Sequence, residues 1–90
     1  MFEKAEKIKE TEKGFVYDLG GITYIFRKKG FASADHEHDG EENFILLEGE
    51  AELTIGDKTE KITAPKVVSI PSNIYHKLLP LTDVRVIHKK

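Results

Sequence analysis

Residues 30–49 read GFASADHEHDGEENFILLEG and contain two short β-like runs, 32–38 and 43–47. Turn residues bound these runs at Gly30, Gly40 and Gly49. Glycine supplies the positive-φ corners that tight turns need, and Asp39 before Gly40 favours a turn as well. This segment therefore predicts two consecutive strands connected by a turn.

Similar runs follow one another from Gly14 onward, and none of them keeps a helical period. Besides the two above, they are 15–19, 22–27, 51–55, 58–63, 66–70, 76–79 and 83–88. Many short strands with close, even turn signals indicate an all-β sandwich, barrel or jelly roll. We predict one β-barrel domain over residues 14–90, because 90 residues leave no room for a second domain.

Residues 1–13 form a polar lead-in that is rich in lysine and glutamate. Phe2, Ala5 and Ile8 recur at a spacing of three, which a short amphipathic helix would show. The pattern is too short to decide, so a short helix and an extended lead-in are both open.

The composition excludes several classes of function. Charged residues make up 33% of the chain with a net charge of -2, which offers no basic field for nucleic acid or an anionic membrane. Cysteine is absent, so disulfides, thiolate nucleophiles and cysteine-based metal sites are excluded. No secretory signal or bilayer-spanning run is present. These features predict a cytoplasmic protein that binds neither nucleic acid nor membrane.

Two histidines share one face of the run 32–38. Side chains alternate along a strand, so His36 and His38 point the same way, while Asp35 and Glu37 point the opposite way. The acidic face belongs in water, which turns both histidines inward. A lone inward histidine would be an ordinary core residue, but two imidazoles at this spacing chelate a metal well.

Glu42 opens the next run on the same face as Phe44 and Leu46. These two apolar residues should enter the core and carry Glu42 inward, where a carboxylate beside histidines needs a cation. A solvated glutamate at a strand start is the alternative. Ile45, on the opposite face, is also apolar, so alternation by itself does not fix the face.

His76 follows a corner at Pro71 and Asn73, since asparagine tolerates the left-handed conformation. Alternation places His76 with Leu78 on one face and Lys77 on the other, which turns His76 inward. Taken alone, it would be a core or rim residue.

The spacing of these residues resembles the two signatures of the cupin superfamily. Gly30, His36, His38, Glu42 and Gly49 follow the first signature at every position. A match of this kind arises by accident in roughly one chain in ten thousand, so the motif is specific. In the second signature, Pro71 and His76 fit and Asn73 replaces a glycine, while Pro65 and Pro80 replace the first glycine and the final asparagine.

The resemblance implies an all-β, antiparallel jelly-roll β-barrel over roughly residues 20–88, and frequent dimerisation through sheet edges. It also implies one divalent metal ion on His36, His38, Glu42 and His76. Nitrogen and carboxylate donors without sulfur suit Mn, Fe, Ni, Co, Cu or Zn. Four protein ligands on a six-coordinate ion leave two positions for a small-molecule ligand or substrate.

Other side chains carry weaker signals. His88, near the C-terminus, is interpreted as an exposed or rim residue. Asp35 could orient a ligand histidine, although a solvated rim is the usual role of such an acid. The aromatic residues that could line a ligand pocket, or simply fill the core, are Tyr24, Phe26, Phe44 and Tyr75.

The resemblance leaves three hypotheses for function open. Cupins with this ligand set include dioxygenases, decarboxylases and isomerases, but no separate general acid or base can be identified and the catalytic residues are unknown. A non-catalytic module that binds or senses a small molecule or a metal is the alternative. The third hypothesis is a purely structural metal that fastens the barrel.

Overall fold

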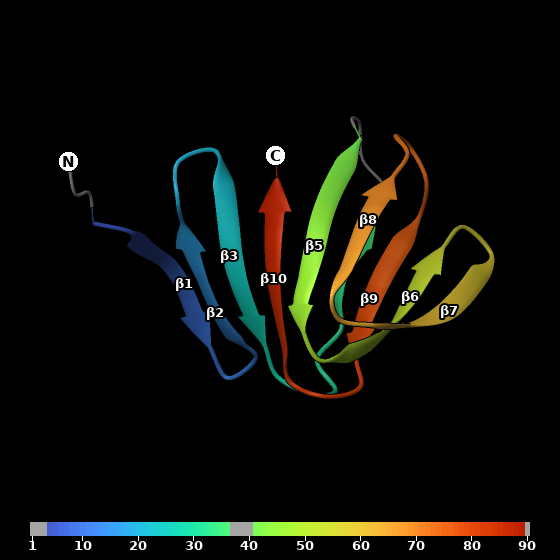
Figure 1. Cartoon of the computed structure of the whole chain (residues 1–90), viewed down its shortest axis with the longest axis horizontal. Helices are drawn as coiled ribbons and strands as arrows, with labels where there is room; N and C mark the ends of the chain where they lie inside the picture. The colour runs from blue at the N-terminus through green and yellow to red at the C-terminus, as the bar shows by residue number, and fades with distance from the viewer. Residues whose placement is uncertain (1–3, 37–40, 90) are drawn as a thin grey trace.

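The computed structural model describes residues 4–36 and 41–89, with side chains throughout these ranges except at residues 33–36. All regular structure in these residues is β (Figure 1). The strands are β1 (Glu6–Thr11), β2 (Gly14–Asp18), β3 (Ile22–Arg27), β4 (Ser33–His36), β5 (Glu42–Glu48), β6 (Glu50–Ile55), β7 (Lys58–Thr63), β8 (Lys66–Ile70), β9 (His76–Pro80) and β10 (Val84–Lys89). Each predicted run contains a strand, because turn chemistry and period-2 alternation are local signals, while residues 37–40, which hold the end of the run 32–38 and the turn predicted at Gly40, lie outside the described residues.

Residues 6–11 of the lead-in form a strand, so the helical alternative is wrong there; residues 1–3 lie outside the described residues. β1 pairs antiparallel with β2, with Lys7 opposite Tyr17 and Thr11 opposite Gly14. Every residue of β1 is exposed, and the Ile8 side chain keeps 54% of its accessible surface. An amphipathic helix needs a surface to cover, whereas a strand satisfies its backbone groups by pairing with β2. No helix that is long and apolar enough to cross a membrane occurs in the described residues.

The strands form two antiparallel sheets. One has six strands in the order β1-β2-β3-β10-β5-β8, and the other has four in the order β4-β9-β6-β7. β10, the last strand in sequence, lies between β3 and β5 (Figure 1). β10 therefore connects the strands β1–β3 to the strands β5 and β8 within the larger sheet.

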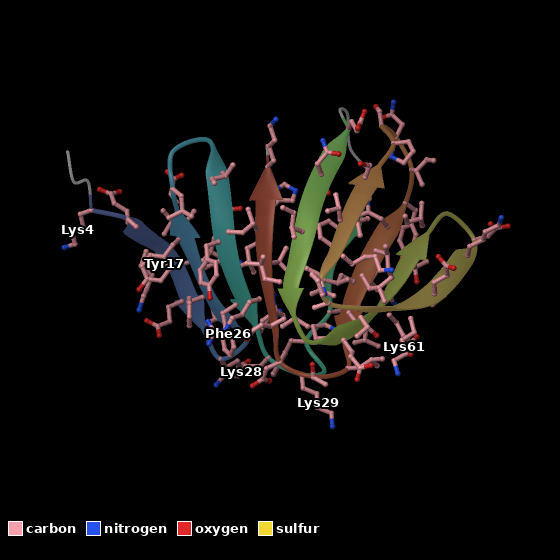
Figure 2. All side chains as sticks on the ribbon, viewed as in Figure 1. Lys4, Tyr17, Phe26, Lys28, Lys29 and Lys61 are labelled. Atoms are coloured by element: carbon pink, nitrogen blue, oxygen red, sulfur yellow. The ribbon has the colours of Figure 1, made fainter. Side chains whose placement is uncertain are left out.

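A single apolar core joins the two sheets. The larger sheet contributes Leu46 and Val84, both fully buried, and the smaller sheet contributes Ala51 and Leu53. Most of the described charged side chains lie outside this core; Lys29 and Lys61, for example, point away from the molecule (Figure 2). The core therefore lies between the sheets, where alternate residues of each strand meet.

Alternation along β5 sets the inner face of the larger sheet. Phe44 and Leu46 are buried, whereas Ile45 is 38% exposed on the outer face. Phe44 pairs with Val68 on β8 and with His88 on β10, so these residues share the inner face. The sequence could not decide which face of this strand is buried, because Ile45 is apolar too. The structure shows that Phe44 and Leu46 form the buried face.

Candidate functional site

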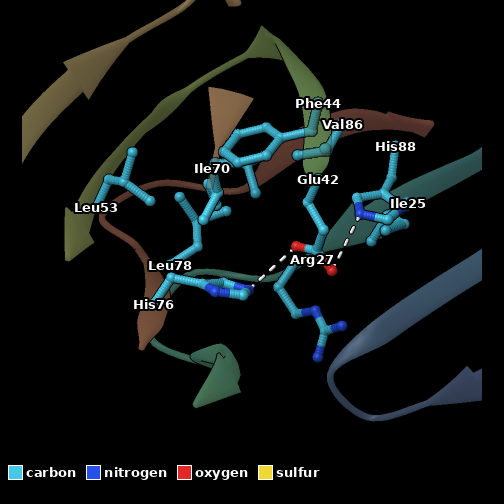
Figure 3. Close-up of a pocket in the computed structure, with 11 residues that line it drawn as sticks. Ile25, Arg27, Glu42, Phe44, Leu53, Ile70, His76, Leu78, Val86 and His88 are labelled. Atoms are coloured by element: carbon cyan, nitrogen blue, oxygen red, sulfur yellow. Dashed lines mark ion pairs between the residues drawn. The ribbon is translucent and has the colours of Figure 1, made fainter. Parts of the chain in front are cut away.

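A cavity of about 250 Å³ lies between the sheets. Its apolar walls include Ile25, Phe44, Leu53, Ile70, Leu78 and Val86. Four residues with ionisable side chains also line it, namely Arg27, Glu42, His76 and His88 (Figure 3). An apolar cavity with a few convergent polar groups is the usual form of a small-molecule site.

Glu42 contacts both histidines of the cavity through its carboxylate. Its Oε2 lies 3.1 Å from Nε2 of His76, and its Oε1 lies 3.5 Å from Nε2 of His88 (Figure 3). Glu42 reaches the cavity because it opens β5 on the inner face, in register with Ile70 of β8. Alternation along β5 therefore predicted its position correctly.

His76 is buried at the start of β9, as predicted from its alternation with Lys77. The preceding corner contains Asn73 in the left-handed conformation, at φ 60°. Nδ1 of His76 donates a hydrogen bond to the carbonyl oxygen of Ile74 at 3.1 Å, since a carbonyl can only accept. With Nδ1 engaged by this carbonyl, Nε2 is the ring nitrogen that faces the Glu42 carboxylate, and either a proton or a metal ion can lie between these two atoms.

The other two predicted ligands are described less completely. The backbone register pairs His36 on β4 with His76 on β9, although these residues are far apart in sequence. The side chain of His36 and the whole of His38 lie outside what the structure describes. Among the side chains that it does describe, no three metal-ligating groups are arranged to hold an ion. The full ligand set therefore stays a prediction.

The observed donors fit a divalent transition metal. Two ligands at about 2.0–2.2 Å from one ion, in neighbouring coordination positions, lie about 3 Å apart. The distance of 3.1 Å between Oε2 of Glu42 and Nε2 of His76 matches this spacing. One carboxylate and one imidazole are also donors that such ions accept.

His88 and Arg27 are cavity residues that the sequence analysis missed. His88 was interpreted as an exposed or rim residue, but only 22% of its side chain is exposed and it faces Glu42. Alternation could have found it, because His88 shares a face with Val84 and Val86 of β10, both buried. In the same way, Arg27 shares a face with Thr23 and Ile25 on β3, but a charged residue at a strand end usually points to solvent.

The candidate pocket aromatics separate into two groups. Phe44 lines the cavity, whereas Tyr24, Phe26 and Tyr75 are not among its lining residues. Phe26 stacks on Phe15, with ring centroids 5.0 Å apart. Tyr24 pairs in register with Ile87, on the opposite face of the sheet from the cavity.

Comparison with known families gives one match that covers most of the chain. The model of the cupin domain matches residues 23–87. No curated protein matches the chain.

Several solved structures share the fold at low sequence identity. An RmlC-like cupin from Shewanella frigidimarina is 17% identical with a TM-score of 0.80, over 94% of this chain and 81% of that one. The capsular polysaccharide assembling protein CapF from Staphylococcus aureus is 19% identical with a TM-score of 0.77, over 98% of this chain and 28% of that one. Salicylate 1,2-dioxygenase from Pseudaminobacter salicylatoxidans is 16% identical with a TM-score of 0.70, over 81% of this chain and 20% of that one.

The last two proteins are much longer than this chain, which spans between a fifth and a third of their length. At this identity the likeness establishes the fold alone. The two antiparallel sheets are those of a jelly roll, as predicted.

Proposed function

This chain belongs to the cupin family, and we propose that it binds a small molecule at a divalent metal ion held by His36, His38, Glu42 and His76. Cupins often bind metals, so the family favours this role. The matched region, residues 23–87, contains all four residues. The cavity beside Glu42 and His76 provides the space for a ligand.

One observation carries the proposal. Oε2 of Glu42 and Nε2 of His76 lie 3.1 Å apart in a largely apolar cavity, and Nδ1 of His76 is engaged by a backbone carbonyl. A carboxylate oxygen and an imidazole nitrogen this close in such surroundings need a cation between them, either a proton or a metal ion. A metal ion meets this need, and the hydrogen bond from Nδ1 then orients the imidazole as a ligand.

The proposed chemistry follows from the donor set. When bound, a divalent ion would supply Lewis-acid polarisation of an oxygen-bearing ligand, as in metal-dependent dioxygenases, decarboxylases and isomerases. The protein's own part is to hold the ion with Glu42 and His76 and to keep water away with apolar walls such as Phe44 and Ile70.

Metal analysis of the purified protein tests the proposal. We expect about one equivalent of a transition metal per chain after supplementation with Mn, Fe, Ni or Zn. His76→Ala and His36→Ala should each remove most of it, whereas His88→Ala is the matched control. His88 also contacts Glu42, through the other carboxylate oxygen, but lies outside the predicted ligand set. Its loss should leave the metal content close to that of the unmodified protein.

A folded protein that takes up no metal under any of these conditions would refute the proposal. Chelation separates the remaining alternatives. Unfolding on chelation without any ligand binding would indicate a purely structural metal. Metal-dependent turnover would indicate an enzyme, and metal-dependent binding without turnover would indicate a sensing or binding module.

A further inference from the structure

The two arginines of the chain have different surroundings. Arg85, on the outer face of β10, donates from Nε to Oε2 of Glu48 at 3.0 Å and also contacts the Tyr24 hydroxyl. Its guanidinium lies over the ring of Phe26, 4.9 Å from the centroid. The Arg85 guanidinium therefore has hydrogen-bond and aromatic partners, and the Glu48 carboxylate balances its charge.

Arg27 has no comparable partner. It lines the cavity from the end of β3, and its Nε is buried without a hydrogen-bond acceptor among the described residues. No ion pair joins it to another side chain of residues 4–32 or 41–89, the part of the chain whose side chains the structure describes. Burial lowers the pKa of the Arg27 guanidinium and no acidic neighbour opposes this, yet an arginine remains charged at neutral pH.

The one carboxylate among the described cavity residues does not neutralise Arg27. Glu42 directs Oε2 to His76 and Oε1 to His88. A divalent ion on Glu42 would leave the site with a net positive charge, and Arg27 would add one more. Arg27 is only partly buried, but its buried Nε has no acceptor among the described residues, and an anionic ligand would lower the cost of holding this charge in an apolar cavity.

We infer that Arg27 makes this cavity a site for a small molecule with a carboxylate on an apolar body. The inference rests on the ligand binding proposed above. The walls formed by Ile25, Val84 and Val86 suit the apolar body. Nε and one terminal nitrogen of a guanidinium form a planar pair of donors that matches the two oxygens of a carboxylate. The other cavity residues that the structure describes include no further lysine or arginine, which a phosphate group would favour.

Benzoate is the probe, with benzyl alcohol as its neutral analogue and phenyl phosphate as the alternative anion. Binding is measured by titration calorimetry, or by NMR line broadening if it is weak, on metal-free and zinc-loaded protein. We expect benzoate to bind better than both analogues. Arg27→Met should weaken benzoate binding by about 10- to 100-fold and leave benzyl alcohol unchanged. Arg27→Lys, which keeps the charge but loses the planar pair, should fall in between.

Arg85→Met is the matched control, because it removes an arginine from the opposite face and should leave benzoate binding unchanged. A urea unfolding curve checks the fold, and Arg27→Met should be about as stable as the unmodified protein, since the partly buried guanidinium makes no ion pair with a described side chain. Equal benzoate affinity of Arg27→Met and the unmodified protein would overturn the inference, as would a preference for phenyl phosphate or benzyl alcohol. Failure of the metal proposal can be distinguished from failure of this inference. In that case the protein would take up no zinc but would still bind benzoate in an Arg27-dependent way.

Discussion

Replacing Gly49 by alanine should destabilise the protein far more than the same change at Gly56. Gly49 joins β5 to β6 at φ +96°, a conformation that L-residues rarely adopt. A Cβ there would lie 2.4 Å from the carbonyl oxygen of Asp83, 2.7 Å from Oγ1 of Thr82 and 2.9 Å from Cγ1 of Val84. The Asp83 carbonyl belongs to the backbone leading into β10, so it cannot move without disturbing that strand.

The two sites differ in a way that fixes the expected magnitudes. Gly56, in the turn between β6 and β7, has φ +63° and open space around its Cβ position. Alanine there costs about 1–2 kcal/mol for the left-handed conformation, offset by about 0.4–1 kcal/mol from the less flexible unfolded chain. At Gly49 the same conformational cost is joined by a steric term of about 1–3 kcal/mol. The offset from the unfolded chain applies at both sites, so we expect a loss of about 2–4 kcal/mol for Gly49→Ala and about 1 kcal/mol for Gly56→Ala.

Urea unfolding monitored by circular dichroism measures both free energies of unfolding. Each kcal/mol should also lower Tm by about 4–8 °C in a domain of this size. Gly30→Ala is a second control: Gly30 belongs to the same sequence signature and has φ +86°, but its Cβ position is open. Similar losses at all three glycines would show that the close approach of residues 82–84 is not what requires glycine at position 49.

Two further predictions concern the core and the surface. Leu46→Ala should lower the free energy of unfolding by about 2–5 kcal/mol because Leu46 is fully buried, whereas Leu47→Ala, at a 42% exposed neighbour, should change it by about 0.5 kcal/mol or less in the same urea assay. Lys61 donates a hydrogen bond to Glu50 and attracts its charge, which lowers the pKa of the Glu50 carboxyl, so Lys61→Met should raise that pKa toward its ordinary value in an NMR titration. This interaction stabilises the folded state above the unfolded-state pKa of Glu50, and the stabilisation is lost as the pH falls through the folded-state pKa. An unchanged Glu50 titration in Lys61→Met would contradict this assignment.

The sequence predicted the β-strands and the direction of the two described ligand candidates. Turn residues such as Asn73 and the period-2 alternation act over a few residues, so they can be recognised without knowledge of the fold. Alternation placed Glu42 with Phe44 and His76 with Leu78, and all four line the cavity. The spacing of the motif residues was specific enough to indicate the family, which the match over residues 23–87 confirms.

Other features depended on contacts between distant parts of the chain. Whether residues 6–11 formed a helix or a strand depended on the free edge of β2, which no local pattern reveals. His88 and Arg27 enter the cavity because β10 inserts between β3 and β5, opposite residues about 40 to 65 positions earlier in sequence. Strand alternation gives the relative faces of neighbouring residues, but strand pairing decides which face encloses the cavity and which charges meet there.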